Sequence, residues 1–557
     1  APHHVPEEWA DKYKGQFDDG WDVYRQRTLE RQKKLGIVPA DTELAPRPEA
    51  FPAWESLSAA ERTLYARQME VFAGFSENAD WNVGRLLDSV EEMGELDNTL
   101  VIYIWGDNGA SMEGTTTGSF NETTFFNGVV LDAEEQLALI EKFGGVAELG
   151  GFHTAPHFAA AWAHANNTPF RWGKQMASHL GGTRDPMVIS WPRRIAAGGE
   201  LRTQFTHCID VVPTVLEVIG LPEPTRVDGV EQEPMDGTSF AYTFDAPEAE
   251  EQHTVQYFEM YGSRAIYKDG WWACTKLDKL PWDFSPETLA RFGPGGQWHP
   301  DQDVWELYYL PDDFSQAHDR AAENPDKVTE LVELFWAEAE RNRVLPLLGG
   351  FAAFFGILPP MPTQTRFSFA GDVQNIQTTM IPRIYGRSYA IEANVHVPDG
   401  GAEGVLVAFA DFIGGFALWV DESGLLNHTY QFLGVDTYRQ TSTEPIPTGD
   451  VTLTMLFEAD EATPGTGGHV TLWAGDRQIG EGDMPRSIAM LFTTYAGMDI
   501  GRDNGGVVDL DYEDRAPYAF TGTVRNVVFD LAPRAHDSEV SLHEATTQAA
   551  IAHGAAG

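Results

Sequence analysis

The pattern of apolar residues changes once along this chain, near residue 350, and the change limits the folds that the chain can adopt. Before it, stretches with helical periodicity alternate with short continuous apolar runs, which is typical of α/β domains. After it, short alternating runs are separated by glycine-containing turns, which is typical of an all-β sandwich. We therefore predict an α/β domain over 1–345, a Gly- and Pro-rich linker over 346–365, a β-sandwich over 366–535 and a tail over 536–557.

Helix and strand signals alternate in the first part. Ser58-x-x-Glu61 is a capping box that opens a helix with an apolar stripe from Leu64 to Met93. Further helices are expected over 210–219 and 326–343. Two apolar runs, 99–105 and 187–191, predict buried parallel strands. Two strands are few for an open α/β sheet, so we expect a sheet that is incomplete at its N-terminal side. The alternative is a small mixed sheet with strands that the pattern does not reveal.

Charge and cysteine content exclude several classes of protein. The formal net charge is −46, from 84 acidic and 38 basic residues, which disfavours a nucleic-acid partner because the two molecules would repel. The longest apolar stretch, 345–358, is too short to span a bilayer, so we expect no membrane partner. Cys208 and Cys274 can form at most one disulfide and fit no zinc motif. No signal-peptide pattern is visible. We expect a soluble cytoplasmic or periplasmic protein, and the oligomeric state stays open.

The sharpest local signal is Gly106-Asp107-Asn108-Gly109. It follows a predicted strand, and open α/β sheets place ligands at the carboxyl ends of their strands. The Asp107 carboxylate and the Asn108 amide oxygen are hard ligands that suit Ca²⁺ or Mg²⁺. The alternative is a tight turn, because Asp, Asn and Gly are common turn residues. Calcium takes about six to eight oxygen ligands, so these two residues cannot form the whole site.

A second signal runs from Gly173 to Pro186 and precedes the second strand. Lys174 and Arg184 could contact an anion at the end of the sheet. The alternatives are a solvated lysine and an arginine in an ion pair. His179 is expected to be a packed or hydrogen-bonded histidine rather than a catalytic one.

Together, these motifs resemble the type I sulfatase family of the alkaline phosphatase superfamily, and in particular large bacterial arylsulfatases with an appended C-terminal β domain. The resemblance covers about residues 1–350 and rests on six segments: 1–9 (APHHVPEEW), 93–102 (MGELDNTLVI), 106–111 (GDNGAS), 173–186 (GKQMASHLGGTRDP), 206–216 (THCIDVVPTVL) and 305–310 (WELYYL).

The resemblance implies an alkaline-phosphatase-like sheet flanked by helices and hydrolysis of a small-molecule or sugar sulfate ester. In that family a cysteine oxidised to formylglycine attacks the sulfur as its hydrate, and Ca²⁺ stabilises the sulfate oxygens. Asp107 and Asn108 match the family's downstream calcium ligands, and Lys174 matches the lysine that contacts the sulfate. A family histidine that protonates the leaving alcohol is expected to be missing, with His3 or His4 as a possible replacement.

The sequence also departs from the family pattern. It contains neither Cys-x-Pro-Ser-Arg nor Ser-x-Pro-Ser-Arg, and the paired upstream aspartates of the calcium site are absent. Both belong to the N-terminal half of the family's hydrolase domain, which agrees with the incomplete sheet. We therefore expect a truncated sulfatase with half an active site that is inactive by itself.

Two other functions remain open at this point. A phosphatase or phosphonate monoesterase of the same superfamily would usually have histidine in place of Asn108, since imidazole suits transition metals. A non-catalytic carbohydrate-binding remnant would use aromatic side chains of the β part to stack on sugars. The candidates are Tyr385, Tyr389, Trp419, Tyr430 and Trp473. The alternative is that most of these rings belong to the core.

Overall fold

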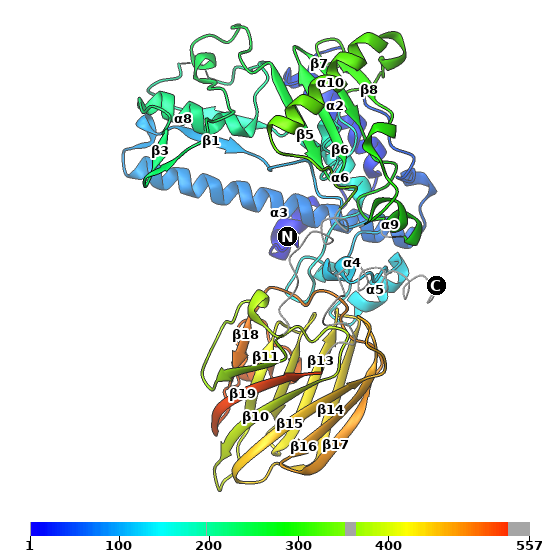
Figure 1. Cartoon of the computed structure of the whole chain (residues 1–557), viewed down its shortest axis with the longest axis vertical. Helices are drawn as coiled ribbons and strands as arrows, with labels where there is room; N and C mark the ends of the chain where they lie inside the picture. The colour runs from blue at the N-terminus through cyan, green and yellow to red at the C-terminus, as the bar shows by residue number, and fades with distance from the viewer. Residues whose placement is uncertain (1, 197, 284, 294, 351–363, 533–557) are drawn as a thin grey trace.

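The computed structural model describes residues 2–196, 198–283, 285–293, 295–350 and 364–532. Helices and small sheets form the upper part of Figure 1, and two large antiparallel sheets form the lower part. The expected class, an α/β part followed by a β part, is confirmed. Most of the predicted linker and all of the predicted tail lie outside the described residues. Within the described ranges, no helix has both the length and the apolar character that crossing a bilayer requires.

Three helices hold the core of the first part together: α2 (Gly20–Leu35), α3 (Ala59–Glu92) and α6 (Ala160–Asn166). The predicted capping box is present, since Ser58 accepts from the Glu61 amide and the Glu61 side chain accepts from the Ser58 amide. The N-terminal half of α3 is buried against α6, where the Trp162 indole donates to the Tyr65 carbonyl at 2.9 Å. The C-terminal half is not buried. Leu86 is 65% exposed, so the apolar stripe expected along the whole helix is wrong for this half.

The two predicted buried parallel strands form a different arrangement. β1 (Val101–Ile104) and β2 (Met187–Ser190) pair antiparallel as a two-stranded sheet, with Ile104 opposite Met187. The sheet lies between α3 and α8 (Val211–Ile219). It is only partly covered, and Val188 is 63% exposed. A continuous apolar run suggested burial on both faces, but the described structure supplies too few neighbours to cover this sheet.

A four-stranded antiparallel sheet that the sequence pattern did not reveal follows in the order β5 (Val255–Met260), β6 (Ser263–Lys268), β7 (Trp271–Thr275) and β8 (Glu306–Tyr309). The predicted helix over 326–343 is present as α10 (Pro325–Arg341) and packs on one face of this sheet through Leu331 and Phe335. Leu180, in the 173–186 block, packs on the other face. The remaining elements of the first part are short: α1 (Glu7–Ala10), α4 (Thr123–Phe126), α5 (Ala133–Glu141), α7 (Leu180–Thr183), β3 (Arg226–Val227), β4 (Val230–Glu231) and α9 (Pro286–Phe292).

Residues 366–531, here called the two-sheet region, form two antiparallel sheets around a shared apolar core. One sheet has the order β17-β16-β15-β10-β19-β9 and the other β14-β13-β12-β11-β18. The strands are β9 (Arg366–Ala370), β10 (Tyr389–Val397), β11 (Gly404–Phe409), β12 (Phe416–Val420), β13 (Leu425–Phe432), β14 (Asp436–Pro445), β15 (Gly449–Ala459), β16 (Gly468–Ala474), β17 (Arg477–Met484), β18 (Met498–Ile500) and β19 (Thr523–Leu531). Tyr389, Trp419 and Tyr430 are buried there, so these three rings do not offer a sugar-binding face.

The segment that contains α4 and α5 lies between the rest of the first part and the two-sheet region and contacts the latter (Figure 1). The Asn121 amide donates to the Leu433 carbonyl at 2.8 Å. The Asn127 amide donates to the Leu491 carbonyl at 2.8 Å and accepts from the Met490 amide at 2.9 Å. The contact therefore uses main-chain groups in loops of the two-sheet region.

Candidate functional site

The two predicted motifs meet through their backbones. The Lys174 amide donates to the Ala110 carbonyl at 3.0 Å, and the Gly109 amide donates to the Gly182 carbonyl at 3.2 Å. A Cβ atom at position 109 would stand 1.7 Å from the Gly181 carbonyl oxygen, so only glycine allows this approach. The loop after β1 and the block before β2 are therefore in direct contact, although more than 60 residues separate them in sequence.

Three oxygen-bearing side chains gather at the end of β1. The Asn108 amide donates to the Asp107 carboxylate at 3.0 Å, which leaves the Asn108 carbonyl oxygen available. Asp185 lies beside them, and its carboxylate would stand 3.2 Å from a Cβ at Gly106. Burial and the neighbouring Asp107 charge raise the pKa of Asp185 to about 6. Within the described residues, neither aspartate forms an ion pair.

Asp185 was not among the predicted site residues, although it lies inside the 173–186 block. The antiparallel register of β1 and β2 places it there: Ile104 is opposite Met187, and the Trp105 amide donates to the Pro186 carbonyl at 3.1 Å. Continuing this register by one more residue sets Asp185 opposite Gly106. The expectation of parallel strands hid this neighbour, because parallel pairing would bring different residues together.

Lys174 belongs to a chain of polar contacts that runs into the interior. Its ammonium group lies 3.1 Å from the Glu113 carboxylate. The other Glu113 oxygen lies 3.1 Å from the Ser111 hydroxyl, which lies 3.0 Å from Nε2 of His157. His157 is buried, and burial lowers its pKa to about 4. Lys174 is thus partnered, not the solvated lysine of the alternative interpretation. Glu113, Ser111 and His157 were not predicted as site residues, although Ser111 ends the 106–111 segment.

The other predicted candidates lie in different surroundings. His3 is buried and packs against the rings of His157 and Phe158 at centroid distances of 4.8 and 4.9 Å, whereas His4 is exposed. The Arg184 guanidinium lies 4.3 Å from the centre of the Phe314 ring. Stacking on an aromatic ring does not support the suggested contact of Arg184 with an anion.

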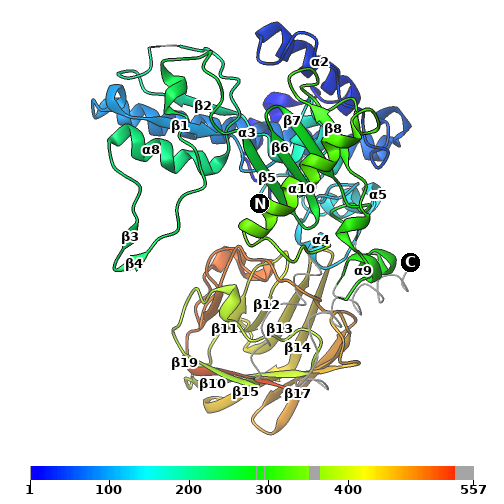
Figure 2. The same ribbon diagram turned by 45° about the horizontal axis from the view of Figure 1, so that its top comes forward.

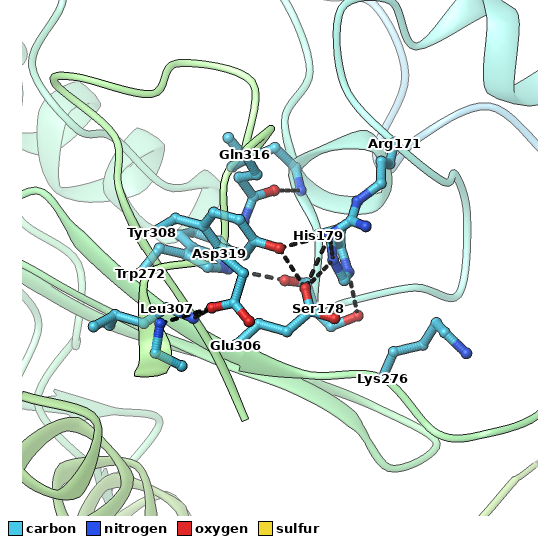
Figure 3. Close-up of polar contacts among 12 residues, drawn as sticks. Arg171, Ser178, His179, Trp272, Lys276, Glu306, Leu307, Tyr308, Gln316 and Asp319 are labelled. Atoms are coloured by element: carbon cyan, nitrogen blue, oxygen red, sulfur yellow. Dashed lines mark hydrogen bonds and ion pairs between the residues drawn. The ribbon is translucent and has the colours of Figure 1, made fainter. Parts of the chain in front are cut away.

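A second cluster, shown in Figure 3, links the 173–186 block to the four-stranded sheet. Nη2 of Arg171 lies 3.0 Å from His179 Nε2, 2.9 Å from the Glu306 carboxylate and 2.6 Å from the Tyr308 hydroxyl. His179 is hydrogen-bonded, as expected. Cys274 lies close enough to His179 and Glu306 for the three to resemble a metal-ligand set. The set fits a metal poorly, because the Arg171 guanidinium already provides the cation that both His179 and Glu306 contact.

Both cysteines are free thiols, Cys208 exposed and Cys274 buried. Burial raises the pKa of the Cys274 thiol well above its ordinary value, so this thiol stays protonated and unreactive. Neither cysteine belongs to the group of residues around Asp107 and Lys174 described above.

Comparison with known proteins gives these residues a context. Residues 1–221 match the protein-family model described as Sulfatase. The chain is 30% identical to an uncharacterized sulfatase of Schizosaccharomyces pombe over 356 residues, which are 62% of this chain and 57% of that protein. It is 31% identical to the arylsulfatase of Klebsiella aerogenes over 226 residues, which are 40% of this chain and 45% of that protein. The chain thus spans about half the length of these two curated relatives.

Among solved structures, a candidate sulfatase from Bacteroides fragilis matches at 12% identity with a TM-score of 0.33, over 64% of this chain and 53% of that one.

Proposed function

We propose that this chain contributes the cation-binding and sulfate-binding residues of an arylsulfatase-type site for sulfate monoesters, because residues 1–221 match the sulfatase family model and the chain is similar to two sulfatases. One observation carries the proposal. The Gly106–Ser111 loop and the Gly173–Pro186 block are hydrogen-bonded to each other through their backbones, which supports a shared role for the carboxylate–amide pair of the first and the lysine of the second.

The residues around Asp107 fit a hard divalent cation such as Ca²⁺. Two neighbouring carboxylates, Asp107 and Asp185, have no cationic partner among the described residues, and the Asn108 carbonyl oxygen is available beside them. Burial and the Asp107 charge raise the pKa of Asp185, and a bound cation would offset the repulsion between the two carboxylates. Calcium held by these three side chains would supply positive charge for the sulfate oxygens.

Lys174 would bind a sulfate oxygen. An ammonium group has three donors, and the contact with Glu113 uses one of them, so two remain for an anion. Positive charge fixed beside the reacting group stabilises negative charge that develops in the transition state. The role of Lys174 in this proposal is to orient the ester and stabilise its charge.

The nucleophile is the part of the site that these residues do not supply. No formylglycine motif occurs in the sequence, and neither cysteine is placed to replace it. The residues present therefore do not fit that group. We propose that this chain alone binds sulfate without hydrolysing its esters, which agrees with its spanning about half of the relatives' length.

Calorimetry on the full 557-residue chain tests the proposal with calcium and inorganic sulfate as probes. Lys174→Met is expected to weaken sulfate binding about tenfold or more, because a charge-assisted hydrogen bond contributes roughly 1.5–3 kcal/mol. Asp107→Asn is expected to weaken calcium binding. Lys268→Met, which removes a lysine paired with Glu330 at 2.8 Å far from the site, should change neither. Equal sulfate affinities for wild type and Lys174→Met would refute the proposal, and preference for zinc or manganese over calcium would favour the phosphatase alternative.

A further inference from the structure

We propose that Glu113, held in place by Ser111 and His157, is the positioning residue of Lys174 and sets the direction in which its ammonium group meets an anion. The identity of that anion as sulfate rests on the proposed function above. The arrangement of the four side chains does not, because it follows from their contacts.

Backbone contacts hold His157 in place at the inner end of this series of side-chain contacts. His157 exchanges two backbone hydrogen bonds with Ser119, at 2.8 and 2.9 Å. The turn that carries Ser111 and Glu113 presses against the same segment, since a Cβ at Gly114 would stand 2.0 Å from the Phe158 carbonyl oxygen. Ser111 and His157 therefore have little freedom to move apart, and Glu113 rests on a rigid support.

The positions of the protons on His157 and Ser111 follow from the acceptors that these side chains face. Nδ1 of His157 lies 3.1 Å from the Phe158 carbonyl oxygen, which can only accept, so Nδ1 carries the proton of the neutral ring. Nε2 is then an acceptor. The Ser111 hydroxyl has one proton but faces two acceptors, His157 Nε2 and the Glu113 carboxylate. When Glu113 is ionised, the single Ser111 proton can therefore serve only one of these two acceptors.

Lys174 explains why Glu113 is nevertheless ionised. Burial raises the pKa of Glu113, but the Lys174 charge and hydrogen bond, with a smaller effect from the Ser111 hydrogen bond, outweigh it and lower the pKa below its ordinary value. His157 faces His3, Glu113 and Lys174, and burial keeps it neutral. Lys174 and Glu113 therefore form an ion pair in which their side chains are 32% and 22% exposed, respectively.

This assignment gives two Glu113 variants opposite expected effects. In Glu113→Gln, the amide N–H donates to Ser111, the hydroxyl donates to His157, and the amide oxygen still accepts from Lys174. Every donor then has an acceptor, so Lys174 keeps its position while the local negative charge is lost. Glu113→Ala removes the same charge and also the contact. Comparing Gln with Ala therefore separates position from charge.

Side-chain NMR of lysine labelled at Cε measures the position directly, because the chain has only ten lysines. Lys174→Met identifies the Lys174 signal. We expect a restrained ε-methylene group in wild type and Glu113→Gln, and in Glu113→Ala a mobility equal to that of the exposed Lys142. Ser111→Ala should also increase the mobility. Unchanged order in Glu113→Ala, or equal mobility in the Ala and Gln variants, would overturn the proposal. Circular dichroism confirms that each variant is folded.

Calorimetry with inorganic sulfate tests the consequence for binding. Glu113→Gln should bind sulfate at least as tightly as wild type, since one competing charge is gone, and Glu113→Ala several-fold more weakly than Glu113→Gln. If Lys174→Met abolishes sulfate binding but the two Glu113 variants bind sulfate equally, the positioning role of Glu113 is refuted and the proposed function is not. If wild type binds no sulfate, the proposed function fails, and the NMR comparison still decides the positioning role.

Discussion

Three buried aspartates of the two-sheet region lack a basic partner in the part of the chain that the structure describes. Asp411, Asp499 and Asp503 are 2–3% exposed. Asp503 accepts from the Tyr512 hydroxyl at 2.6 Å and the Val508 amide at 2.8 Å. Burial nevertheless raises its pKa to about 7. A carboxyl whose pKa is raised on folding binds more protons in the folded state, so the folded state loses stability as pH rises through this range.

Asp503→Asn should therefore remove a pH dependence. From an ordinary value of 3.8 to about 7, ionisation destabilises the fold by up to about 4 kcal/mol, of which about 2 kcal/mol falls between pH 5.5 and 8. Asparagine keeps the acceptor for Tyr512 and Val508. We expect hydrogen exchange of β12 amides in wild type to quicken over this interval beyond its intrinsic pH dependence, and the variant to lack the excess. An equal excess in both proteins would contradict the assignment.

At the scale of residues, the sequence predicted the parts of the site that form local motifs. Asp107, Asn108 and Lys174 were found in this way, and the structure brings their loops together, while their proposed roles still await tests. His157 could not be predicted, because it lies 46 residues from Ser111 and no local pattern connects the two. Asp185 could have been found only with the correct strand direction.

At the scale of elements, glycines set how closely the loop after β1 approaches the block before β2. Gly109→Ala should push this contact apart, since the new Cβ would stand 1.7 Å from a backbone oxygen that no side-chain rotation can move. We expect a destabilisation of more than about 2 kcal/mol, as is usual for strong overpacking, and at least tenfold weaker sulfate binding. Thermal melts and calorimetry measure both effects.

Gly84→Ala is the matched control for this substitution. Gly84 lies within α3, and a Cβ there meets nothing within 4 Å. Alanine should stabilise the helix by about 0.5–1 kcal/mol without affecting sulfate binding. A Gly109→Ala protein that binds sulfate like this control would show that the two loops need not touch.

Elements with strong local signals were predicted well. The capping box at Ser58 and Glu61 marks the start of α3, as predicted. β14 consists mostly of polar residues, Asp436–Pro445, and is a strand because it pairs with β13. Pairing with a neighbour is a long-range property that a local apolar pattern does not contain.

At the scale of the whole molecule, Asn127 connects the two parts. It is 3% exposed, and its side chain satisfies the Met490 and Leu491 amides and the Leu491 carbonyl. Asn127→Ala would leave these partly buried groups without their partner, which we expect to destabilise the contact by about 1–3 kcal/mol. Hydrogen exchange at residues 490–491 should accelerate. Asn82→Ala, on the exposed surface of α3, should leave that exchange unchanged, and equal rates in the two variants would refute the role of Asn127.

The antiparallel pairing of β1 and β2 has a consequence for how the first part resists slippage. A one-residue slip of such a ribbon turns every side chain to the opposite face and would carry Asp185 away from Asp107. An ion bound by both carboxylates would stabilise only the native register, because a slipped register would separate the two side chains. The free energy of this stabilisation would grow with the logarithm of the free ion concentration. The ambient calcium concentration would therefore affect how firmly β1 and β2 keep their register, as well as the charge beside them.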